Sequence, residues 1–427
     1  MIMKSFWYLF YNGFVIPLAK LFLFFAKLFN SKINSGIKGR KKLFENLIIH
    51  LADINRKKKM IWFHSASMGE FEQAKPIIEK IRSEKNVNIV LSFFSPSGYL
   101  NSLKYPNADI ITYFPYDTPI MAARFLNLVR PNLAILMRYE VWPNMIWQLE
   151  KKNIPCFIVD ATMRKKTARK WIFAKDFHKS VYKHVTRILT VSKEDLTNYK
   201  EFNINDDKIK AVGDTRFDRV YQKSLQAKEK KLFKDKFFAG KKVFVIGSSW
   251  ENDEEVVLPA LLKIMEVEKN ILTIIVPHEP TLVHIERLEN LFHKKQSSIR
   301  FSLLNNYSKE RIIIIDSIGI LLTLYYHCHV AYVGGSFKQG IHNVLEPAVY
   351  GIPVLFGPKH GNSQEAVKLA ALGGGIVVQN KKDVYRTLRK LFSDEKTRKR
   401  IGKINSDYVK DNIGATSKII SEIYQYI

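Results

Sequence analysis

The stretch VAYVGGSFKQGIHNVLEP, residues Val330–Pro347, begins with four apolar residues of β character and continues into a pair of glycines. A short loop follows, and then a segment whose composition suits a helix, with Asn343 near its start. A strand, a glycine loop and a helix in this order direct unpaired backbone N–H groups and the positive end of a helix dipole toward one point, where an anion can bind. The pattern predicts a parallel α/β sheet with a ligand site at the carboxyl end of this strand.

The side chains of this loop suit a phosphorylated sugar or a nucleotide. Its three glycines carry no Cβ, so the backbone can approach a ligand closely. His342 and Asn343 supply hydrogen-bond donors, and Glu346, one helical turn beyond Asn343, is placed to accept hydrogen bonds from sugar hydroxyls. A tight turn before a capped helix has the same residue pattern, so the loop alone leaves both interpretations open.

Short apolar segments alternate with helical patterns along the whole chain, as in parallel βαβ units. In the first half we expect strands at 60–63, 87–93, 109–113, 133–137 and 155–159. In the second half we expect strands at 242–246, 271–276, 312–316, 330–333, 353–356 and 375–378. Polar loops follow several of these strands directly, at 64–70, 137–144, 247–249, 277–278 and 334–346. The sequence therefore predicts two Rossmann-like domains with parallel sheets and a ligand cleft at the carboxyl ends of their strands.

The length of 427 residues is too great for one ordinary core and favours two domains. We expect residues 1–30 to form a membrane anchor and residues 31–221 to form the first domain. A lysine-rich segment, 222–242, is expected as the linker. The second domain is expected at 243–427, and its last helix could cross back to the first domain.

The two cysteines, Cys156 and Cys328, lie far apart in apolar surroundings, and no Cys/His cluster has metal-ligand spacing. We therefore expect neither a zinc site nor a disulfide framework, and a reducing compartment fits. The formal net charge of +28 suggests nucleic acid, an anionic membrane surface or an acidic substrate as partner. The sequence contains no recognisable helix-turn-helix, zinc finger or RNP motif, which argues against nucleic acid.

The N-terminal residues favour the membrane. Residues 6–29 are rich in Phe, Leu, Trp and Tyr, and Lys20 and Lys27 are their only charges. About 20 apolar residues can span a bilayer, although Lys20 weakens that interpretation. Five Lys and Arg residues between positions 32 and 42 favour a cytoplasmic location for the chain that follows. We expect an anchor in the inner membrane, spanning or interfacial, with the catalytic body on the cytoplasmic face; a buried amphipathic helix is the alternative.

Six motifs, in this order, resemble those of the 3-deoxy-D-manno-octulosonic acid (Kdo) transferases of lipopolysaccharide synthesis. They are HSASMGE at 64–70, FPYD at 114–117, EVWPN at 140–144, VGDTRFD at 212–218, GGSF with HNVLEP at 334–347, and FGP at 356–358. Enzymes of this family are glycosyltransferases that move Kdo from CMP-Kdo to a lipid A precursor. The resemblance covers essentially the whole chain. It implies a GT-B fold, with the acceptor on the N-terminal domain, the donor on the C-terminal domain, no metal and no cofactor.

The resemblance also implies catalytic roles. Glycosyl transfer needs a base within reach of the acceptor hydroxyl, and by family likeness Glu70 is that base. A carboxylate that merely complements a helix dipole is the alternative. Arg138 stands where the family commonly has Glu, so either that carboxylate's role moves to Glu140 or Arg138 contacts a substrate anion. Arg216 stands where the family has Lys and is expected to stabilise the leaving phosphate, with a surface salt bridge as the alternative.

Binding residues follow from the same motifs. The expected donor site comprises Ser248, Pro277, His278, Ile318, Gly319, Ile320, Gly334, Gly335, Ser336, His342, Asn343, Val344, Leu345 and Glu346. Within it, Pro277 stands where the family often has Arg, and Ile341 stands beside His342 where glycine is more usual. The expected acceptor site comprises His64, Ser67, Gly69, Arg164 and Lys165. The basic run that begins at Arg164 is either a solvated helix face or a surface for acceptor phosphates and anionic headgroups.

Three rival functions were weighed against Kdo transfer. A nucleotide-sugar epimerase with the same fold has no need of an apolar anchor or a basic acceptor surface. A different membrane-associated glycosyltransferase shares the architecture, and a membrane-tethered basic binding protein is the non-enzymatic alternative. Transfer of Kdo to lipid IVA explains the motifs, the anchor and the charge together, with CMP-Kdo, the lipid A precursor and inner-membrane lipid as partners.

Overall fold

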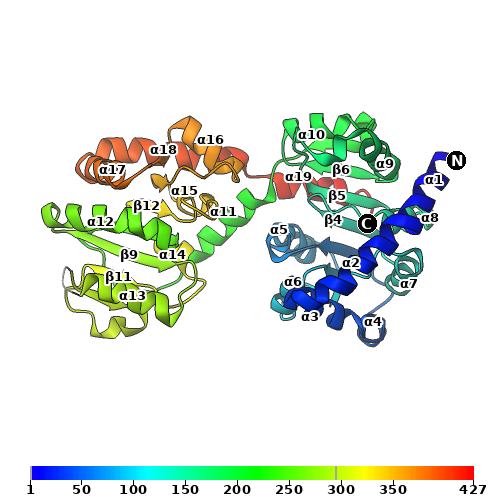
Figure 1. Ribbon diagram of the computed structural model, residues 1–427, viewed down its shortest axis with the longest axis horizontal. Helices are drawn as coiled ribbons and strands as arrows, with labels where there is room; N and C mark the ends of the chain where they lie inside the picture. Colours follow the sequence, from blue (N-terminus) through cyan, green and yellow to red (C-terminus); the bar gives the residue numbers. More distant parts are fainter. Residues whose placement is uncertain (1, 294–295) are drawn as a thin grey trace. The chain divides into compact units, whose positions relative to one another are not determined.

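The computed structural model of the chain describes residues 2–293 and 296–427 (Figure 1). These residues fold into two compact units, the first made of 1–219 with 413–427 and the second of 220–412. Each unit holds a seven-stranded sheet whose neighbouring strands all run parallel. The expected fold class, two Rossmann-like α/β domains, is confirmed.

The sheet of the first unit has the order β3-β2-β1-β4-β5-β6-β7. Its strands are β1 Met60–Ser65, β2 Asn88–Phe93, β3 Ile110–Tyr113, β4 Leu133–Met137, β5 Cys156–Ala161, β6 Arg187–Thr190 and β7 Ile209–Ala211. The helices of this unit are α1 Ile2–Phe10, α2 Ile16–Phe29, α3 Ser31–Arg40, α4 Leu43–Ala52, α5 Met68–Glu84, α6 Pro96–Ser102, α7 Pro119–Val129, α8 Pro143–Lys151, α9 Ile172–Tyr182, α10 Lys193–Lys200 and α19 Ala415–Ile423. Helix α11, Thr215–Lys228, begins in the first unit and ends in the second.

The sheet of the second unit has the order β10-β11-β9-β8-β12-β13-β14. Its strands are β8 Lys242–Ser249, β9 Ile271–Pro277, β10 Ser298–Arg300, β11 Ile312–Ile314, β12 Val330–Val333, β13 Val354–Phe356 and β14 Gly375–Val377. Its helices are α12 Glu251–Val267, α13 Leu282–Phe292, α14 Leu321–Tyr326, α15 Leu345–Ala348, α16 Gln364–Leu372, α17 Lys381–Ser393 and α18 Glu395–Asn412.

Both faces of each sheet are buried, which explains why the central strands are continuous apolar runs. In β1, the side chain of Trp62 packs into the core on one face, and those of Ile61 and Phe63 pack into the core on the other. This alternation follows from the two-residue period of a strand. Polar groups are thereby displaced to the ends of the strands, and the loops after the carboxyl ends carry most of the sequence motifs.

The observed unit boundaries differ from the expected ones. The segment 222–242, expected as a linker, belongs to the second unit, where Phe233, Phe237 and Phe238 pack against its core. The last helix, α19, belongs to the first unit and packs on α5. Asp218 fixes this return, because its carboxylate accepts hydrogen bonds from the backbone N–H groups of Gly414 and Thr416, each at 2.6 Å.

The segment expected as an anchor is one continuous helical stretch, in which the π-helical turn Tyr11–Val15 joins α1 to α2. Its residues Phe6–Phe29 are long and apolar enough to cross a membrane, by length and composition alone. Such a helix is compatible with the expected membrane anchor.

Candidate active site

Glu70 lies at the carboxyl edge of the first sheet, in the turn that joins β1 to α5. Ser67 is the N-cap of α5, and the Glu70 side chain folds back so that its Oε2 accepts from the backbone N–H of Ala66 at 2.5 Å and of Ser67 at 3.3 Å. Only 7% of Glu70 is exposed, and burial raises the pKa of its carboxyl group against the opposing effects of the two N–H groups and Arg138. Glu70 therefore caps a helix and is also a partly buried acid with a perturbed pKa.

Arg138 follows β4, and its positive charge lowers the pKa of Glu70. Its Nη1 donates to Gln73 Oε1 at 3.3 Å, one turn of α5 beyond Glu70. The backbone of Arg138 has a φ of +64°, and its N–H donates to Val159 O at 2.7 Å. The left-handed conformation costs a non-glycine residue on the order of 1–3 kcal/mol, and such strain clusters at functional sites.

Glu140 and His64 face one another at the same edge, with His64 Nε2 4.0 Å from Glu140 Oε2, which is longer than a hydrogen bond. His64 is fully buried, and burial lowers its pKa to about 3, so the ring is neutral. Its Nδ1 lies 3.2 Å from the Ser92 carbonyl oxygen, which can only accept. We therefore assign the ring proton to Nδ1 and a lone pair to Nε2.

Burial, and then the charge of Glu70, raise the pKa of Glu140 to about 7. Arg169 opposes this shift, and its Nη2 donates to Tyr139 O at 3.1 Å. Among the described residues, His64 Nε2 has no hydrogen-bond partner, although it is buried. Glu140 Oε2 lies 4.0 Å from this nitrogen, beyond hydrogen-bond distance, and Glu140 changes protonation near neutral pH.

Asp160, Asp214 and Arg216 form a third charged group, at the ends of β5 and β7. Two side-chain hydrogen bonds join Arg216 to Asp214: Nε donates to Oδ1 at 3.1 Å, and Nη2 donates to Oδ2 at 2.6 Å. Burial pushes the pKa of Asp214 upward, but Arg216 outweighs burial and holds that pKa below its usual value. Burial and the neighbouring Asp214 charge raise the pKa of Asp160 to about 8.

Thr215 is hydrogen-bonded to the carboxyl group of Asp160. Its hydroxyl lies 2.9 Å from Gln73 O and is also bonded to Asp160 Oδ2. The Thr215 hydroxyl donates to Asp160 Oδ2, and the Thr215 backbone N–H donates to Asp160 Oδ1 at 3.2 Å; both bonds lower the pKa of Asp160 and oppose the effect of burial. The expected leaving-group cation, Arg216, is thus held by a network that starts one turn beyond Glu70.

The expected acceptor residues occupy different depths at this edge. Ser67 caps α5, Gly69 lies in its first turn, and His64 is buried beneath the loop, where it faces Glu140 rather than solvent. Arg164 and Lys165 are exposed in the loop after β5. Gln73, Asp160 and Asp214 also lie at this edge and were not expected as site residues, and Arg169 was expected only as part of the basic run that begins at Arg164. Asp214 lies inside a motif that had been singled out, and that signal could have found it.

In the second unit, Gly334 and Gly335 bring the end of β12 against the end of β8. A Cβ on Gly334 would lie 2.2 Å from Ser248 O, so any side chain there would force the two strands apart. Gly335 has a φ of +93°, and its N–H donates to Asp253 Oδ2 at 2.8 Å. Tyr332 OH donates to the other oxygen of Asp253, also at 2.8 Å. The glycines are therefore required by the packing of the sheet edge itself.

Trp250, His278 and His342 form a stack of three rings beside this loop. The ring centroids of Trp250 and His278 are 4.6 Å apart, and those of His278 and His342 are 4.3 Å apart. Trp250 Nε1 donates to His342 Nε2 at 2.9 Å, so the ring proton of a neutral His342 resides on Nδ1. Burial, and then His278, lower the pKa of His342 to about 4. His342 is therefore a neutral donor at physiological pH.

The helix predicted from Asn343 onward is wrong in length. Helix α15 is a single turn, Leu345–Ala348, and Gly351, with a φ of +71°, lies just beyond it. Asn343 Oδ1 accepts from Leu345 N, and Asn343 Nδ2 donates to Glu346 Oε1, both at 3.1 Å. A single turn sums few peptide dipoles, so the expected dipole contribution to an anion site is small. Burial raises the pKa of Glu346 above its usual value.

The remaining expected donor residues divide by exposure. The side chains of Val344 and Leu345 are buried. Ser336 is also buried, and its Oγ accepts a hydrogen bond from the backbone N–H of Gly357 at 2.5 Å. Ser248 has a φ of +53°, and Pro277 ends β9. The loop before α14 holds the other three, Ile318, Gly319 and Ile320. Ile341, which stands where the family more usually has glycine, is buried, and its backbone N–H donates to Asn362 Oδ1 at 3.1 Å.

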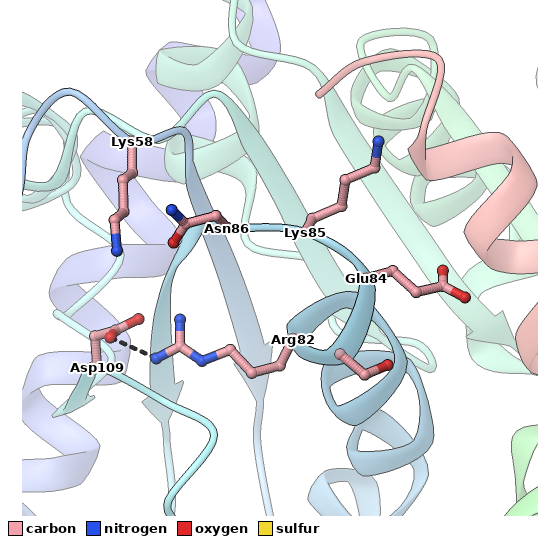
Figure 2. Close-up of a pocket in the computed structure, with 7 residues that line it drawn as sticks. Lys58, Arg82, Glu84, Lys85, Asn86 and Asp109 are labelled. Atoms are coloured by element: carbon pink, nitrogen blue, oxygen red, sulfur yellow. Dashed lines mark hydrogen bonds and ion pairs between the residues drawn. The ribbon is translucent and has the colours of Figure 1, made fainter.

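A hollow of about 490 Å³ lies at the opposite, amino edge of the first sheet (Figure 2). It is lined by Lys58, Arg82, Ser83, Glu84, Lys85, Asn86 and Asp109. Arg82 donates through Nη2 to Asp109 Oδ1 and through Nη1 to Val87 O, both at 2.6 Å. These contacts join the end of α5 to β2 and β3, and we assign the hollow no part in the site. Across residues 2–293 and 296–427, no group of three or more His, Cys, Asp or Glu side chains could hold a metal ion.

Comparison with known proteins identifies the family. Residues 41–219 match a family model described as 3-deoxy-D-manno-octulosonic-acid transferase. A 3-deoxy-D-manno-octulosonic acid transferase from Aquifex aeolicus is 30% identical over 79% of this chain and 88% of its own length. The enzyme of the same name from Haemophilus influenzae is 25% identical over 99% of both chains.

A solved structure shares the fold over most of the chain. It is the UDP-GlcNAc 2-epimerase from Neisseria meningitidis, with a TM-score of 0.61, 14% identity, and coverage of 86% of this chain and 99% of that one. At this identity the likeness extends to the fold alone. The sequence relatives and the family model decide the identity: the chain belongs to the 3-deoxy-D-manno-octulosonic acid transferase family and is a glycosyltransferase.

Proposed function

We propose that this enzyme transfers Kdo from CMP-Kdo to lipid IVA, the lipid A precursor, in the inner core of lipopolysaccharide, without a metal ion and with Glu70 as general base. Membership of the Kdo transferase family supports the reaction. The observation that carries the assignment of residues is the environment of Glu70, a 7% exposed carboxyl group with a raised pKa at the edge of the first sheet. A raised pKa makes a carboxylate a better proton acceptor.

The two oxygens of Glu70 have different tasks in this proposal. Both backbone hydrogen bonds fall on Oε2, and no described residue is hydrogen-bonded to Oε1. Oε1 takes the proton of the acceptor hydroxyl as the hydroxyl oxygen forms its bond to the anomeric carbon of Kdo. The bond between that carbon and the phosphate oxygen breaks, and its electron pair leaves with CMP.

Charged neighbours set the electrostatics of the step. Arg138 lowers the pKa of Glu70 and so keeps the base ionised, and its cation takes the position where the family commonly has Glu. Glu140, with a pKa of about 7, is protonated in part of the enzyme population and takes over the carboxyl role at this edge. Arg216 stabilises the charge that develops on the leaving phosphate. Its ion pair with Asp214 holds the guanidinium in place.

The donor binds the second unit. CMP-Kdo carries a phosphate and a carboxylate. The residues that contact these two anionic groups must therefore be hydrogen-bond donors rather than carboxylates. Support comes from the neutral His342, whose Nδ1–H is available, and from the close backbone approach that Gly334 and Gly335 create. In the proposal Asn343 contacts the phosphate and Glu346 accepts from the ribose hydroxyls. His278, stacked on His342, lies on the same side of the site.

The acceptor binds the first unit. Lipid IVA is a tetra-acylated glucosamine disaccharide with two phosphates, and the exposed Arg164 and Lys165 after β5 supply cations for such phosphates. We place the enzyme on the cytoplasmic face of the inner membrane, held there by the apolar residues Phe6–Phe29.

The test is a transfer assay with the purified full-length protein, detergent-solubilised lipid IVA and preformed CMP-Kdo. We expect release of CMP together with a mass increase of the acceptor equal to one or more Kdo residues. EDTA added to this assay should leave the rate unchanged, because the donor-synthesising step is absent from the tube. Hydrolysis of CMP-Kdo with no change in acceptor mass would contradict the proposal.

A further inference from the structure

The N-terminal end of the apolar helical stretch packs on the first unit. Trp7 is only 8% exposed, and its ring contacts Phe177 of α9 with centroids 5.6 Å apart. Tyr8 and Tyr11 both contact the ring of Trp147 in α8, at 5.4 and 6.0 Å. Figure 1 shows α1 beside α8 and α9, the same neighbours that these contacts give. An apolar stretch that only crossed a membrane would have no such partners in the catalytic body.

Polar contacts fix the same end. Tyr11 OH donates to Asp117 Oδ2 at 3.0 Å. Asn12 and Asn144 exchange side-chain amide hydrogen bonds at 3.0 and 2.9 Å. Asp117 is buried, and it also accepts from the backbone N–H groups of Asn144 and Met145 at the start of α8. Undocking the helix would remove the Tyr11 hydrogen bond from the buried Asp117 and both Asn12 hydrogen bonds from the buried Asn144.

The chain that follows the C-terminal end of this stretch also contacts the first unit. Helix α3 follows α2 after Asn30, and its last residue, Arg40, donates to Phe94 O at 2.6 Å and to Phe114 O at 2.9 Å. The guanidinium of Arg40 also stacks over the ring of Phe94, 4.7 Å from the centroid. These two carbonyl groups follow β2 and β3, on the same unit that holds Trp7.

This geometry is incompatible with a spanning helix. The two ends of a spanning helix lie on opposite sides of a hydrocarbon core about 30 Å thick. Here Trp7 to Asn12 at one end, and Arg40 at the end of the helix that follows the other end, contact one folded unit. If residues up to Asn12 stayed docked, the remaining residues 13–29 would reach about 25 Å, with Lys20 near their middle.

The outward face of the stretch is nevertheless apolar. Its exposed large side chains are Phe6, Leu9, Phe10, Phe14, Leu18, Leu21, Phe22, Phe24, Phe25, Leu28 and Phe29. A second exposed group, Trp171–Phe173, stands at the start of α9, where Trp171, Ile172 and Phe173 are 74%, 81% and 81% exposed. Phe173 precedes Phe177, the contact of Trp7, by one helical turn, so it lies on the same face of α9. Trp171–Phe173 therefore stands at the start of the helix that Trp7 contacts.

Basic side chains surround Trp171–Phe173. Arg164, Lys165 and Lys166 are exposed before it, and Lys175 and Lys179 follow it in α9. Exposed aromatic and aliphatic side chains set among Lys and Arg match an anionic bilayer surface, with its apolar interior and charged headgroups. Lys20 and Lys27 have stems long enough to bring their charges back to the headgroups.

We propose that Phe6–Phe29 lies in the plane of an anionic membrane surface and does not cross it, and that Trp171–Phe173 inserts beside it as a second contact. The occupant of both apolar groups is the lipid bilayer. This placement does not depend on the identity of the sugar transferred. It sets the loop with Arg164 and Lys165 at the level of the headgroups, where phosphates of a membrane-bound lipid are found.

Thiol accessibility tests the topology. A Phe6→Cys variant of the full chain is expressed in cells, and spheroplasts are treated with a membrane-impermeant maleimide before or after lysis in detergent. A Ser393→Cys variant, with its thiol on the exposed end of α17, is the cytoplasmic control, and wild-type protein gives the background of its two native thiols. We expect labelling of both variants only after lysis. Labelling of the Phe6→Cys variant in intact spheroplasts would place residue 6 on the far side and overturn the proposal.

Vesicle flotation tests the second contact. The full-length variant Trp171→Ser/Ile172→Ser/Phe173→Ser is compared with Leu282→Ser/Val283→Ser, which removes exposed apolar side chains from α13 in the second unit. On phosphatidylcholine vesicles that contain phosphatidylglycerol, we expect the first variant to lose about tenfold or more in partitioning and the control to match wild type. Equal partitioning of the first variant and wild type would overturn the second contact and leave a protein partner as its occupant.

The conservative substitution Trp171→Phe tests the second contact with little effect on folding. Trp171→Phe keeps the apolar character of the group, and bromine-labelled lipid quenches only those tryptophans that reach the acyl chains. We expect stronger quenching of wild type than of Trp171→Phe on the same vesicles, because Trp171 contributes the difference. Equal quenching of the two proteins would show that Trp171 stays outside the bilayer and would contradict the proposal.

Discussion

The first unit gathers ionisable side chains at the carboxyl edge of its sheet, whereas the second unit gathers glycines and a stack of three rings at the corresponding edge of its own sheet. In the first unit, burial raises the pKa values of Glu70, Glu140 and Asp160. In the second unit, His342 is neutral, with a pKa of about 4. Perturbed carboxyl groups are suited to moving protons, and neutral donors on a close-packed backbone are suited to holding an anionic ligand. This difference supports the proposal that the first unit carries the chemistry and the second binds the donor.

The largest effect is expected for Glu70→Gln. The amide can still accept from the N–H groups of Ala66 and Ser67, so α5 remains capped, but it cannot take a proton. We expect the turnover rate to fall by about 10²- to 10⁴-fold in the lipid IVA assay. Glu84→Gln, at the exposed far end of the same helix, is the matched control and should retain wild-type turnover. Turnover of Glu70→Gln within threefold or so of the control would remove Glu70 from the proton transfer.

Gly334→Ala should weaken the second unit alone. Its Cβ would lie 2.2 Å from Ser248 O, so β8 and β12 must separate at the site. We expect CMP affinity to drop by about tenfold or more, with a lower unfolding temperature, because overpacking costs about 1–3 kcal/mol. Gly361→Ala is the control, since a Cβ there meets nothing within 4 Å. Unchanged CMP affinity in Gly334→Ala would show that this edge does not hold the nucleotide.

The stability of the first unit should depend on pH through the titration of Glu140. Its pKa of about 7 in the folded protein is raised above the ordinary value of 4.5, so folding favours its protonated form. The stability that this form contributes is fully present below pH 4.5 and is lost as the pH rises through 7. Glu140→Gln should therefore gain on the order of 1–3 kcal/mol of unfolding free energy relative to wild type at pH 8 but not at pH 4.

The same substitution should remove a step near pH 7 from the pH profile of kcat. Chemical denaturation at the two pH values, alongside the rate profile, checks both outcomes. A profile of Glu140→Gln that keeps the step would assign it to another group at this edge.

The smallest effect is expected for Trp250→Phe. The ring stack with His278 can persist, but the hydrogen bond from Nε1 to His342 Nε2 is lost. The proton of His342 is then free to move between its two nitrogens, so the Nδ1–H donor is less well defined, and we expect CMP to bind about two- to fivefold more weakly. The ¹⁵N shifts of His342 report the tautomer directly. A wild-type tautomer in Trp250→Phe would show that Trp250 does not set it.

Much of the fold could be predicted because the central strands are unambiguous. Strands β1, β4, β8, β9 and β12 are apolar runs buried on both faces, and each was predicted from the sequence. Strands β6, β7 and β10 were not predicted; they are three or four residues long and carry charged residues. Such strands are defined by their pairing with a neighbour rather than by their own pattern.

The candidate site was predictable where a short motif carries its own geometry. Glu70 lies in a capping box, Ser67-x-x-Glu70, which fixes its side chain locally. The state of Asp160 was not predictable, because its hydrogen-bond partner Thr215 lies 55 positions away in the chain. The docking of Tyr11 on Asp117, across 106 positions, likewise left no local pattern in the sequence.

The division between the two units is tested most directly by one calorimetric titration of CMP into wild type, Glu70→Gln and Gly334→Ala under identical conditions. If the first unit does the chemistry and the second holds the nucleotide, Glu70→Gln binds CMP as tightly as wild type, within about twofold, while Gly334→Ala loses tenfold or more. Loss of CMP affinity in Glu70→Gln equal to that in Gly334→Ala would contradict the division.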